Sequence, residues 1–260
     1  QMSEQATLNN RIAIVTGAGQ GMGRAVARAL AALGARLVVN DLNAESAEQA
    51  ASEFESSGVE AIAVQADVTD AGAVRGMVER AVERFGAVHI LVNNAGIIRD
   101  GLLVKKDRES GEIVKMSRAQ WQAVIDVNLT GATWMVREVV AWMAGAGAPG
   151  VIVNMSSLSR HGNRGQSSYV AAKAALAANT TTWAREFARF GIRVGALAPG
   201  LIETPMTRDM HQKARDALVA AVPLGRIGAP HDVWLGVKFI IENDYFTGRC
   251  IDIDGGLNMV

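Results

Sequence analysis

The chain has 260 residues, enough to bury a large hydrophobic core within one α/β domain. Its 26 basic and 26 acidic residues cancel and form no basic block, which excludes an electrostatic case for nucleic acid and favours a small-molecule partner. A single cysteine, Cys250, excludes an internal disulfide and cysteine-based metal sites, and it suits the cytoplasm, where we expect the protein to act.

The N-terminal residues 1–7 are polar and lack the basic-then-apolar order of a secretory signal. We therefore expect a short tail ahead of one domain that spans residues 8–260. No apolar stretch approaches the roughly twenty residues needed to cross a bilayer, so we expect no membrane association. The four histidines are scattered without ligand spacing, and we expect no metal.

Short Val/Ile-rich runs alternate with longer Ala-rich amphipathic segments, which is the pattern of βαβ units. The alternation predicts a doubly wound, Rossmann-type parallel sheet with helices on both faces. We expect strands at residues 12–15, 36–40, 61–65, 90–93, 151–154, 193–198 and 250–253. We expect helices at residues 24–34, 44–58, 74–86, 121–143 and 169–191.

The first expected strand leads into TGAGQGMG at residues 16–23, which holds four glycines within seven residues. Glycines at the end of a strand let backbone amides and a helix N-terminus approach a phosphate. Met22 stands where the G-x-G-x-x-G pattern has its last glycine, and the Lys-Ser/Thr ending of a P-loop is missing. From this segment alone, dinucleotide binding and a flexible turn both remain open.

Polar or glycine residues follow each of the first six expected strands. They are the glycine loop, Asp41, Asp67, NNAG at residues 93–96, Ser156 with Ser157, and Pro199 with Gly200. The carboxyl ends of parallel strands meet at one edge of a sheet, where ligands bind in doubly wound folds. We therefore expect the chemistry of this protein at that edge.

Asp41 lies about twenty residues beyond the glycines, at the end of the second expected strand. A carboxylate there can accept both hydroxyls of an adenosine ribose and would repel a 2′-phosphate, which indicates NAD. The cations that would compensate a phosphate are missing at Gln20 and Leu42. The alternative is an ordinary residue flanking a helix.

Tyr169 and Lys173 stand four residues apart at the start of an expected helix, so both side chains project from one face. A free tyrosine has a pKa of about 10, and a nearby ammonium group favours the phenolate and lowers that pKa. By itself the pair is weak evidence for a catalytic base.

Five motifs follow one another along the chain: TGAGQGMG from Thr16, NNAG from Asn93, NLTG from Asn128, Ser156 thirteen residues before YVAAK at Tyr169, and PGLIET from Pro199. In this order they closely resemble the short-chain dehydrogenase/reductase family, over essentially the whole chain. The resemblance implies a nicotinamide-dependent oxidoreductase. It also suggests a homotetramer built on the long helices.

The resemblance implies four catalytic residues. Ser156 would hydrogen-bond the reacting oxygen, and Tyr169 would exchange its proton. Lys173 would hold the nicotinamide ribose and lower the pKa of Tyr169. Asn128 would position a water that leads from that lysine.

Cofactor contacts are implied at the ends of the strands, around the pyrophosphate, the adenine and the carboxamide. The expected set is Gly17, Gln20, Gly21, Met22, Gly23, Asp41, Leu42, Asp67, Val68, Asn94, Ala95, Gly96, Tyr169, Lys173, Pro199, Gly200, Ile202 and Thr204. We expect the substrate pocket at Ser156, Leu158, His161, Tyr169, Leu201, Met206 and Met210.

Three functions remain open. The preferred interpretation is an NAD-dependent dehydrogenase of an apolar secondary alcohol, cyclic and aromatic ones included, which would also reduce the ketone. The alternative is a 3-oxoacyl-thioester reductase, since NNAGIIRDGLL and GNRGQSSYVAAKAAL look like the ketoreductases of fatty-acid synthesis. Two departures weaken this alternative. Those reductases generally use NADPH, which Asp41 disfavours. The arginines with which they bind the acyl carrier protein correspond to Gly147 and Phe190 here, although an arginine, Arg189, lies next to the second position. A cofactor sensor without turnover is the third.

Residues 102–117 form an insertion relative to the family. Apolar residues flank a polar tip at residues 107–111, which ends in glycine, and this pattern predicts a β-hairpin. The alternative is a charged, disordered loop. Because the segment follows the fourth expected strand, we expect the hairpin beside the mouth of the substrate pocket.

Overall fold

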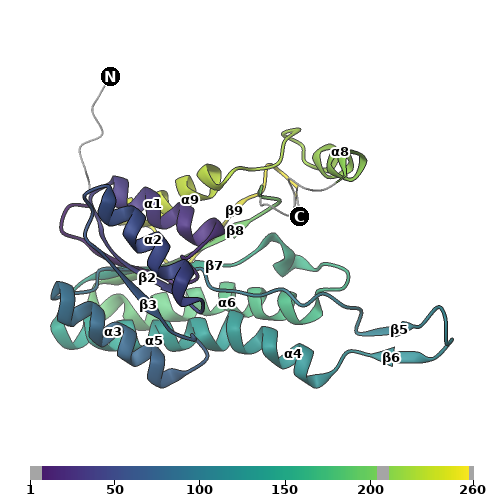
Figure 1. The fold of residues 1–260 in the computed structure, drawn as a ribbon, viewed down its shortest axis with the longest axis horizontal. Helices are drawn as coiled ribbons and strands as arrows, with labels where there is room; N and C mark the ends of the chain where they lie inside the picture. The colour runs from purple at the N-terminus through teal and green to yellow at the C-terminus, as the bar shows by residue number, and fades with distance from the viewer. Residues whose placement is uncertain (1–7, 204–210, 258–260) are drawn as a thin grey trace.

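The computed structural model describes residues 8–203 and 211–257 (Figure 1). Seven parallel strands form one sheet in the order β3-β2-β1-β4-β7-β8-β9, which confirms the predicted doubly wound fold. The strands are β1 (Ile12–Val15), β2 (Arg36–Asp41), β3 (Ala61–Gln65), β4 (Ile90–Asn93), β7 (Gly150–Met155), β8 (Ile192–Pro199) and β9 (Cys250–Ile253).

Helices cover both faces of this sheet. One layer holds α1 (Gly21–Ala32), α2 (Ala44–Ser56) and α9 (Pro230–Glu242), and the other holds α3 (Ala71–Phe85), α5 (Ala132–Ala146) and α6 (Ser167–Phe187) (Figure 1). Each layer has its own hydrophobic cluster against the sheet. This double burial explains the continuous Val/Ile runs, because a strand covered on both faces has no solvent side.

The expected helix at residues 121–143 is divided in the structure. It consists of α4 (Arg118–Ile125), a π-helical turn η1 (Asp126–Gly131) and α5. A π turn inserts an extra residue into the helix and often marks a functional site. Asn128 lies in this turn, so the interruption has a place in the site below.

Further helical elements were not predicted by the alternation pattern. They are α8 (Gln212–Ala221), α9 and the short 3-10 helix η2 (Leu158–His161). A second 3-10 helix, η3 (Ala188–Phe190), forms the end of the helix expected at residues 169–191. Of the helices in the described part of the chain, none combines the length and the hydrophobicity that spanning a bilayer requires.

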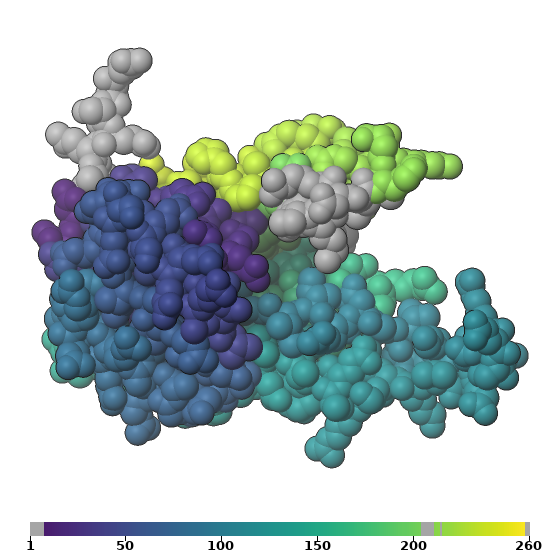
Figure 2. Space-filling model, in the orientation of Figure 1, coloured from purple at the N-terminus to yellow at the C-terminus, as the bar shows by residue number. Residues whose placement is uncertain are grey.

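The predicted hairpin is present. Strands β5 (Val104–Lys106) and β6 (Ile113–Lys115) pair antiparallel, and Gly111 supplies the positive φ of +74° near the turn. Every residue of both strands is exposed, and the hairpin extends beyond α4, away from the body of the molecule (Figures 1 and 2). Its expected place beside the mouth of the substrate pocket stays a prediction.

Replacing residues 105–115 by a short Gly/Ser link should leave the thermal stability unchanged within about 2 °C, because exposed residues add little to the core. Thermal unfolding of the shortened and the parent chain would measure this. A matched control is Val38→Ala, a fully buried change in β2, which should lower the free energy of unfolding by about 2 kcal/mol. A large loss in the shortened chain would contradict the hairpin's independence from the core.

Candidate active site

The end of β1 is tied directly to the end of β4. Thr16 Oγ1 accepts hydrogen bonds from the amides of Asn94 and Ala95, both at 3.0 Å. The Asn94 side chain donates back to the carbonyls of Thr16 and Gly17, at 3.0 and 3.1 Å. Two of the sequence motifs, TGAGQGMG and NNAG, therefore hold each other in place.

The glycines of the loop are required by its packing. A Cβ on Gly23 would lie 2.2 Å from the Gly17 carbonyl oxygen, so a side chain there would displace the loop. Gly21 has φ of +56°, and a Cβ on it would meet no atom within 4 Å, so this side of the loop is open. The backbone therefore forms a cradle in which a ligand can approach the main chain closely.

The N-terminus of α1 has the character of an anion site. Its N-cap, Gln20, makes no side-chain capping hydrogen bond, whereas Asn43 and Asp70 cap α2 and α3 in the ordinary way. The first amides of α1 are thus left for another acceptor, and the helix dipole favours a negative one. This fits the pyrophosphate of a dinucleotide.

Asp41, at the end of β2, contacts the same loop. Its Oδ2 accepts from the Gly19 amide at 3.0 Å, and its Oδ1 accepts from the Asn43 amide at 3.0 Å. A Cβ on Gly19 would lie 2.8 Å from Oδ2. The carboxylate is therefore fixed by two backbone donors, next to the glycine loop as the sequence predicted.

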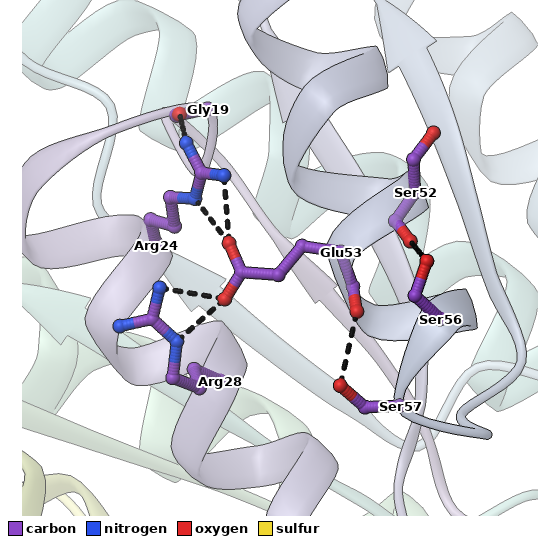
Figure 3. A network of polar contacts seen from close by, with 7 residues as sticks. All are labelled: Gly19, Arg24, Arg28, Ser52, Glu53, Ser56 and Ser57. Carbon is purple, nitrogen blue, oxygen red and sulfur yellow. Dashed lines mark hydrogen bonds and ion pairs between the residues drawn. The ribbon is translucent and has the colours of Figure 1, made fainter.

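A cation that the sequence analysis did not find lies on the other side of Gly19. Arg24, in α1, donates to the Gly19 carbonyl at 3.3 Å and to Glu53 of α2 at 2.7 Å (Figure 3). The expectation of no cation near Asp41 therefore needs correction. Glu53 lies 29 residues from Arg24 in sequence, and only the packing of α1 beside α2 brings them together.

Asn128 lies in the π turn η1 and is buried. Its Nδ2 donates to the carbonyls of Ile97 and Val124, at 2.8 and 2.9 Å, but its Oδ1 has no hydrogen-bond partner among the described residues. A Cβ on Gly96 would lie 2.5 Å from this oxygen and 3.7 Å from Lys173 Nζ. An acceptor and an ammonium group therefore border one small space beside Gly96.

Lys173 of α6 is buried, with 4% of its surface exposed. Its Nζ donates to the Met155 carbonyl at 2.7 Å, and it lies 5.6 Å from the centre of the Tyr169 ring. Burial lowers the pKa of Lys173 to about 8, because the charged form loses its hydration.

Tyr169, one turn earlier in α6, has the opposite shift. Burial raises its pKa above the ordinary value of 10, against the effect of a hydrogen bond with the Ser157 side chain. We expected Lys173 to lower the pKa of Tyr169, but in the single chain the effect of burial dominates and raises it. The ammonium group donates its hydrogen bond to the Met155 carbonyl instead. At neutral pH the phenol therefore keeps its proton.

Ser156 is buried at the end of β7, and its Oγ donates to the Lys173 carbonyl at 2.8 Å. The structure thus brings Asn128, Ser156, Tyr169 and Lys173 together from η1, β7 and α6. Ser157, which the sequence placed at the strand end without a role, contacts Tyr169 directly.

The other expected cofactor residues lie at the same edge. Leu42 and Gln20 are exposed, Val68 is buried, and Asp67 Oδ1 accepts from the amide and the hydroxyl of Thr69 at 2.8 Å. Met22 is half-buried. Gly200 donates its amide to the Ile253 carbonyl at 2.9 Å, and this bond connects the loop after Pro199 to β9.

The expected substrate pocket is less well supported. Leu158 and His161 lie in η2, and His161 is exposed. Leu201 and Ile202 line a cavity of about 460 Å³ with Leu224 and other residues, and neither Ser156 nor Tyr169 lines it. Thr204, Met206 and Met210 lie outside the described residues.

The sequence analysis also did not predict an ion pair near Ser156. Arg160 of η2 pairs with Asp252 of β9 at 2.7 Å and donates to Cys250 Sγ at 2.9 Å. Burial raises the pKa of the Cys250 thiol to about 11, so the thiol stays protonated and is a poor nucleophile.

Comparisons with known proteins agree with this geometry. A family model described as enoyl-(acyl carrier protein) reductase matches residues 17–258. The chain is 39% identical to 3-oxoacyl-(acyl-carrier-protein) reductase FabG of Thermotoga maritima, over 96% of this chain and 98% of that protein. It is 38% identical to 3-oxoacyl-(acyl-carrier-protein) reductase of Synechocystis, over 97% and 98%. It is 41% identical to an uncharacterised oxidoreductase of Mycobacterium tuberculosis, over 96% and 97%.

The fold and the loop define a dinucleotide-binding α/β protein, and the full-length matches make the class more specific. The chain belongs to the short-chain dehydrogenase/reductase family. It is an oxidoreductase that works with a nicotinamide cofactor. The glycine cradle, the uncapped start of α1 and the unpaired Oδ1 of Asn128 fit such a cofactor.

The burial of Lys173 predicts a stability that depends on pH. An unfolded lysine titrates near pH 10.4, whereas the fold lowers the pKa of Lys173 to about 8. Between these values the unfolded chain binds more protons, so this residue makes the free energy of unfolding increase with pH, and its penalty is fully present below pH 8. Lys173→Met should be more stable than the parent at pH 7.5, and that advantage should shrink by about 1–2 kcal/mol by pH 9.5.

Urea unfolding of both chains without ligand, at several pH values, measures the difference. Lys213→Met is the matched control, because Lys213 is exposed and its loss should give no such pH-dependent difference. An advantage that stays constant from pH 7.5 to pH 9.5 would contradict the lowered pKa of Lys173.

Proposed function

We propose that the protein reduces the 3-oxo group of an acyl thioester, carried on an acyl carrier protein or on coenzyme A, with NADH. The observation that carries the substrate is the similarity, over 96–97% of the chain, to proteins named 3-oxoacyl-(acyl-carrier-protein) reductase. The sequence analysis preferred a secondary alcohol dehydrogenase and kept this reductase as its alternative. The names of the relatives support the alternative better.

The protonated Tyr169 supports the direction of the reaction. Reduction of a ketone needs a group that gives a proton to the carbonyl oxygen, and burial keeps that proton on Tyr169 at neutral pH. When bound, a reduced nicotinamide would supply the hydride to the carbonyl carbon. Tyr169 gives its proton to the oxygen as negative charge develops there, so a free alkoxide need not form.

The neighbouring residues prepare this transfer. Ser156 turns from the Lys173 carbonyl to hydrogen-bond the reacting oxygen, and Ser157 fixes the phenol. With the cofactor bound, Lys173 and Asn128 Oδ1 would hold its ribose and a water beside Gly96, and this polar group would return a proton to Tyr169 after each turnover. The complete set of side chains favours turnover over a role as a cofactor sensor.

Asp41 is the basis for proposing NADH. Its carboxylate is fixed at the ribose end of the loop by the amides of Gly19 and Asn43. A ribose can donate two hydroxyl hydrogen bonds to a carboxylate, whereas a 2′-phosphate would meet like charge there. The same feature supports the second candidate, an NAD-dependent dehydrogenase of apolar secondary alcohols.

One panel distinguishes the two candidates and tests the cofactor. The purified protein would be assayed with 3-oxoacyl-coenzyme A, a simple cyclic ketone and the matching alcohols, each with NAD(H) and NADP(H). We expect the thioester to have the highest kcat/KM, and NADH to be preferred at least tenfold, roughly 1.4 kcal/mol. Asp41→Ala should reduce that preference, and Glu55→Ala serves as the control, because Glu55 is an exposed carboxylate of α2 outside the expected cofactor contacts.

Greater efficiency on the cyclic alcohol than on the thioester would favour the dehydrogenase. Equal efficiency with the two cofactors in the parent protein would contradict the role proposed for Asp41.

Tyr169→Phe tests the proton donor. The ring and its packing remain, but the hydroxyl is lost, so kcat should fall by about 100-fold or more while cofactor binding and thermal stability are retained. Tyr245→Phe is the matched control, since Tyr245 is the other tyrosine of the chain and is 97% exposed. Parental turnover by the Tyr169 variant would remove this residue from the mechanism.

A further inference from the structure

Side chains bond to both backbone groups of Gly19. Its amide donates to Asp41 of β2 at 3.0 Å, and its carbonyl accepts from Arg24 of α1 at 3.3 Å. The backbone of one residue therefore connects the carboxylate to the guanidinium group. This makes Arg24 a cation within reach of a ligand group bound next to Asp41.

Glu53 of α2 determines where that cation lies. Its Oε2 accepts from Arg24 Nε and Nη2 at 3.1 and 2.7 Å, and its Oε1 accepts from Arg28 Nε at 2.7 Å (Figure 3). Both carboxylate oxygens are thus occupied by arginines one helical turn apart. Figure 3 shows the Arg24 guanidinium extending from Gly19 to Glu53.

The ion pair of Arg24 and Glu53 stabilises the charged form of Glu53 and is partly shielded from solvent. Burial alone would raise the pKa of Glu53, but the hydrogen bonds from Arg28 and Arg24 outweigh it and lower that pKa below its ordinary value. The side chains of Arg24 and Glu53 are 27% and 34% exposed. Such bidentate geometry fixes a guanidinium group far better than a single exposed ion pair does.

We propose that Glu53 is a positioning residue for cofactor selectivity, which holds Arg24 against α2 and thereby denies its charge to a 2′-phosphate at Asp41. The proposal rests on the proposed use of NADH and adds a second element to it. Asp41 repels the phosphate directly, while Glu53 restrains the cation that would otherwise attract it. Selectivity then depends on a residue outside the glycine loop.

The test measures binding of two probes that lack nicotinamide, ADP-ribose and its 2′-phosphate, by isothermal titration calorimetry. The parent protein should bind ADP-ribose at least tenfold more tightly. In Glu53→Gln, which releases Arg24, the preference should shrink at least fivefold, mainly because the 2′-phosphate binds more tightly. A change in fold alone would weaken both probes together.

Two further variants isolate the cause. Glu55→Gln removes the same charge from the same helix, and Glu55 is exposed, so the preference should stay parental. The double variant Arg24→Gln/Glu53→Gln restores the parental net charge and removes the released cation. It should lose the gain for the 2′-phosphate that the single Glu53 variant shows.

Should Glu53→Gln prove unstable by thermal unfolding, Arg24→Lys replaces it. A lysine keeps the charge but cannot bridge Gly19 and Glu53 at once, so the preference should shrink at least twofold.

A parental preference in a folded Glu53→Gln would overturn the proposal. So would an equal gain in Glu55→Gln, or a gain that persists in the double variant. A parent that binds neither probe would refute the dinucleotide function itself, and Glu53's role with it. A parent that binds both probes equally would refute the NADH preference and leave no selectivity for Glu53 to produce.

Discussion

All seven strands of the main sheet run in the same direction, and the position of every functional group follows from that constraint. The carboxyl ends of β1, β2, β4 and β7 meet at one edge, so the loops that follow them are neighbours in space. Thr16 then bonds to Asn94, and Asp41 bonds to Gly19, across strands that are distant in sequence. Because helices cover both faces, the sheet is rigid behind these loops.

The same burial shifts the pKa values of two groups on α6. Lys173 is an ammonium group enclosed by protein, and Tyr169 is a phenol largely removed from water. Desolvation disfavours both charged forms, so it lowers the pKa of the lysine and raises that of the tyrosine. The proton affinities of the two groups therefore move apart, and the phenol holds its proton more tightly than the ammonium group does.

At the glycine loop, the charged side chains are fixed by hydrogen bonds and ion pairs rather than by burial. Asp41 is fixed by backbone amides, and Arg24 is fixed by Glu53. An unrestrained arginine beside the loop would counteract the carboxylate, because both groups bond to the backbone of the same residue, Gly19. The network in Figure 3 therefore joins α1 to α2 and holds the Arg24 guanidinium group between Gly19 and Glu53.

The sequence by itself determined the strands, the parallel architecture and the hairpin, and it singled out Asn128, Ser156, Tyr169 and Lys173 as the predicted site. These depend on local periodicity and on fixed spacings, such as the single helical turn between Tyr169 and Lys173. Only the tertiary structure decided the outward direction of the hairpin, the shifted pKa of Tyr169, and the pairing of Arg24 with Glu53 across 29 positions. Burial and long-range contacts depend on how helices pack on the sheet, and no local pattern records that packing.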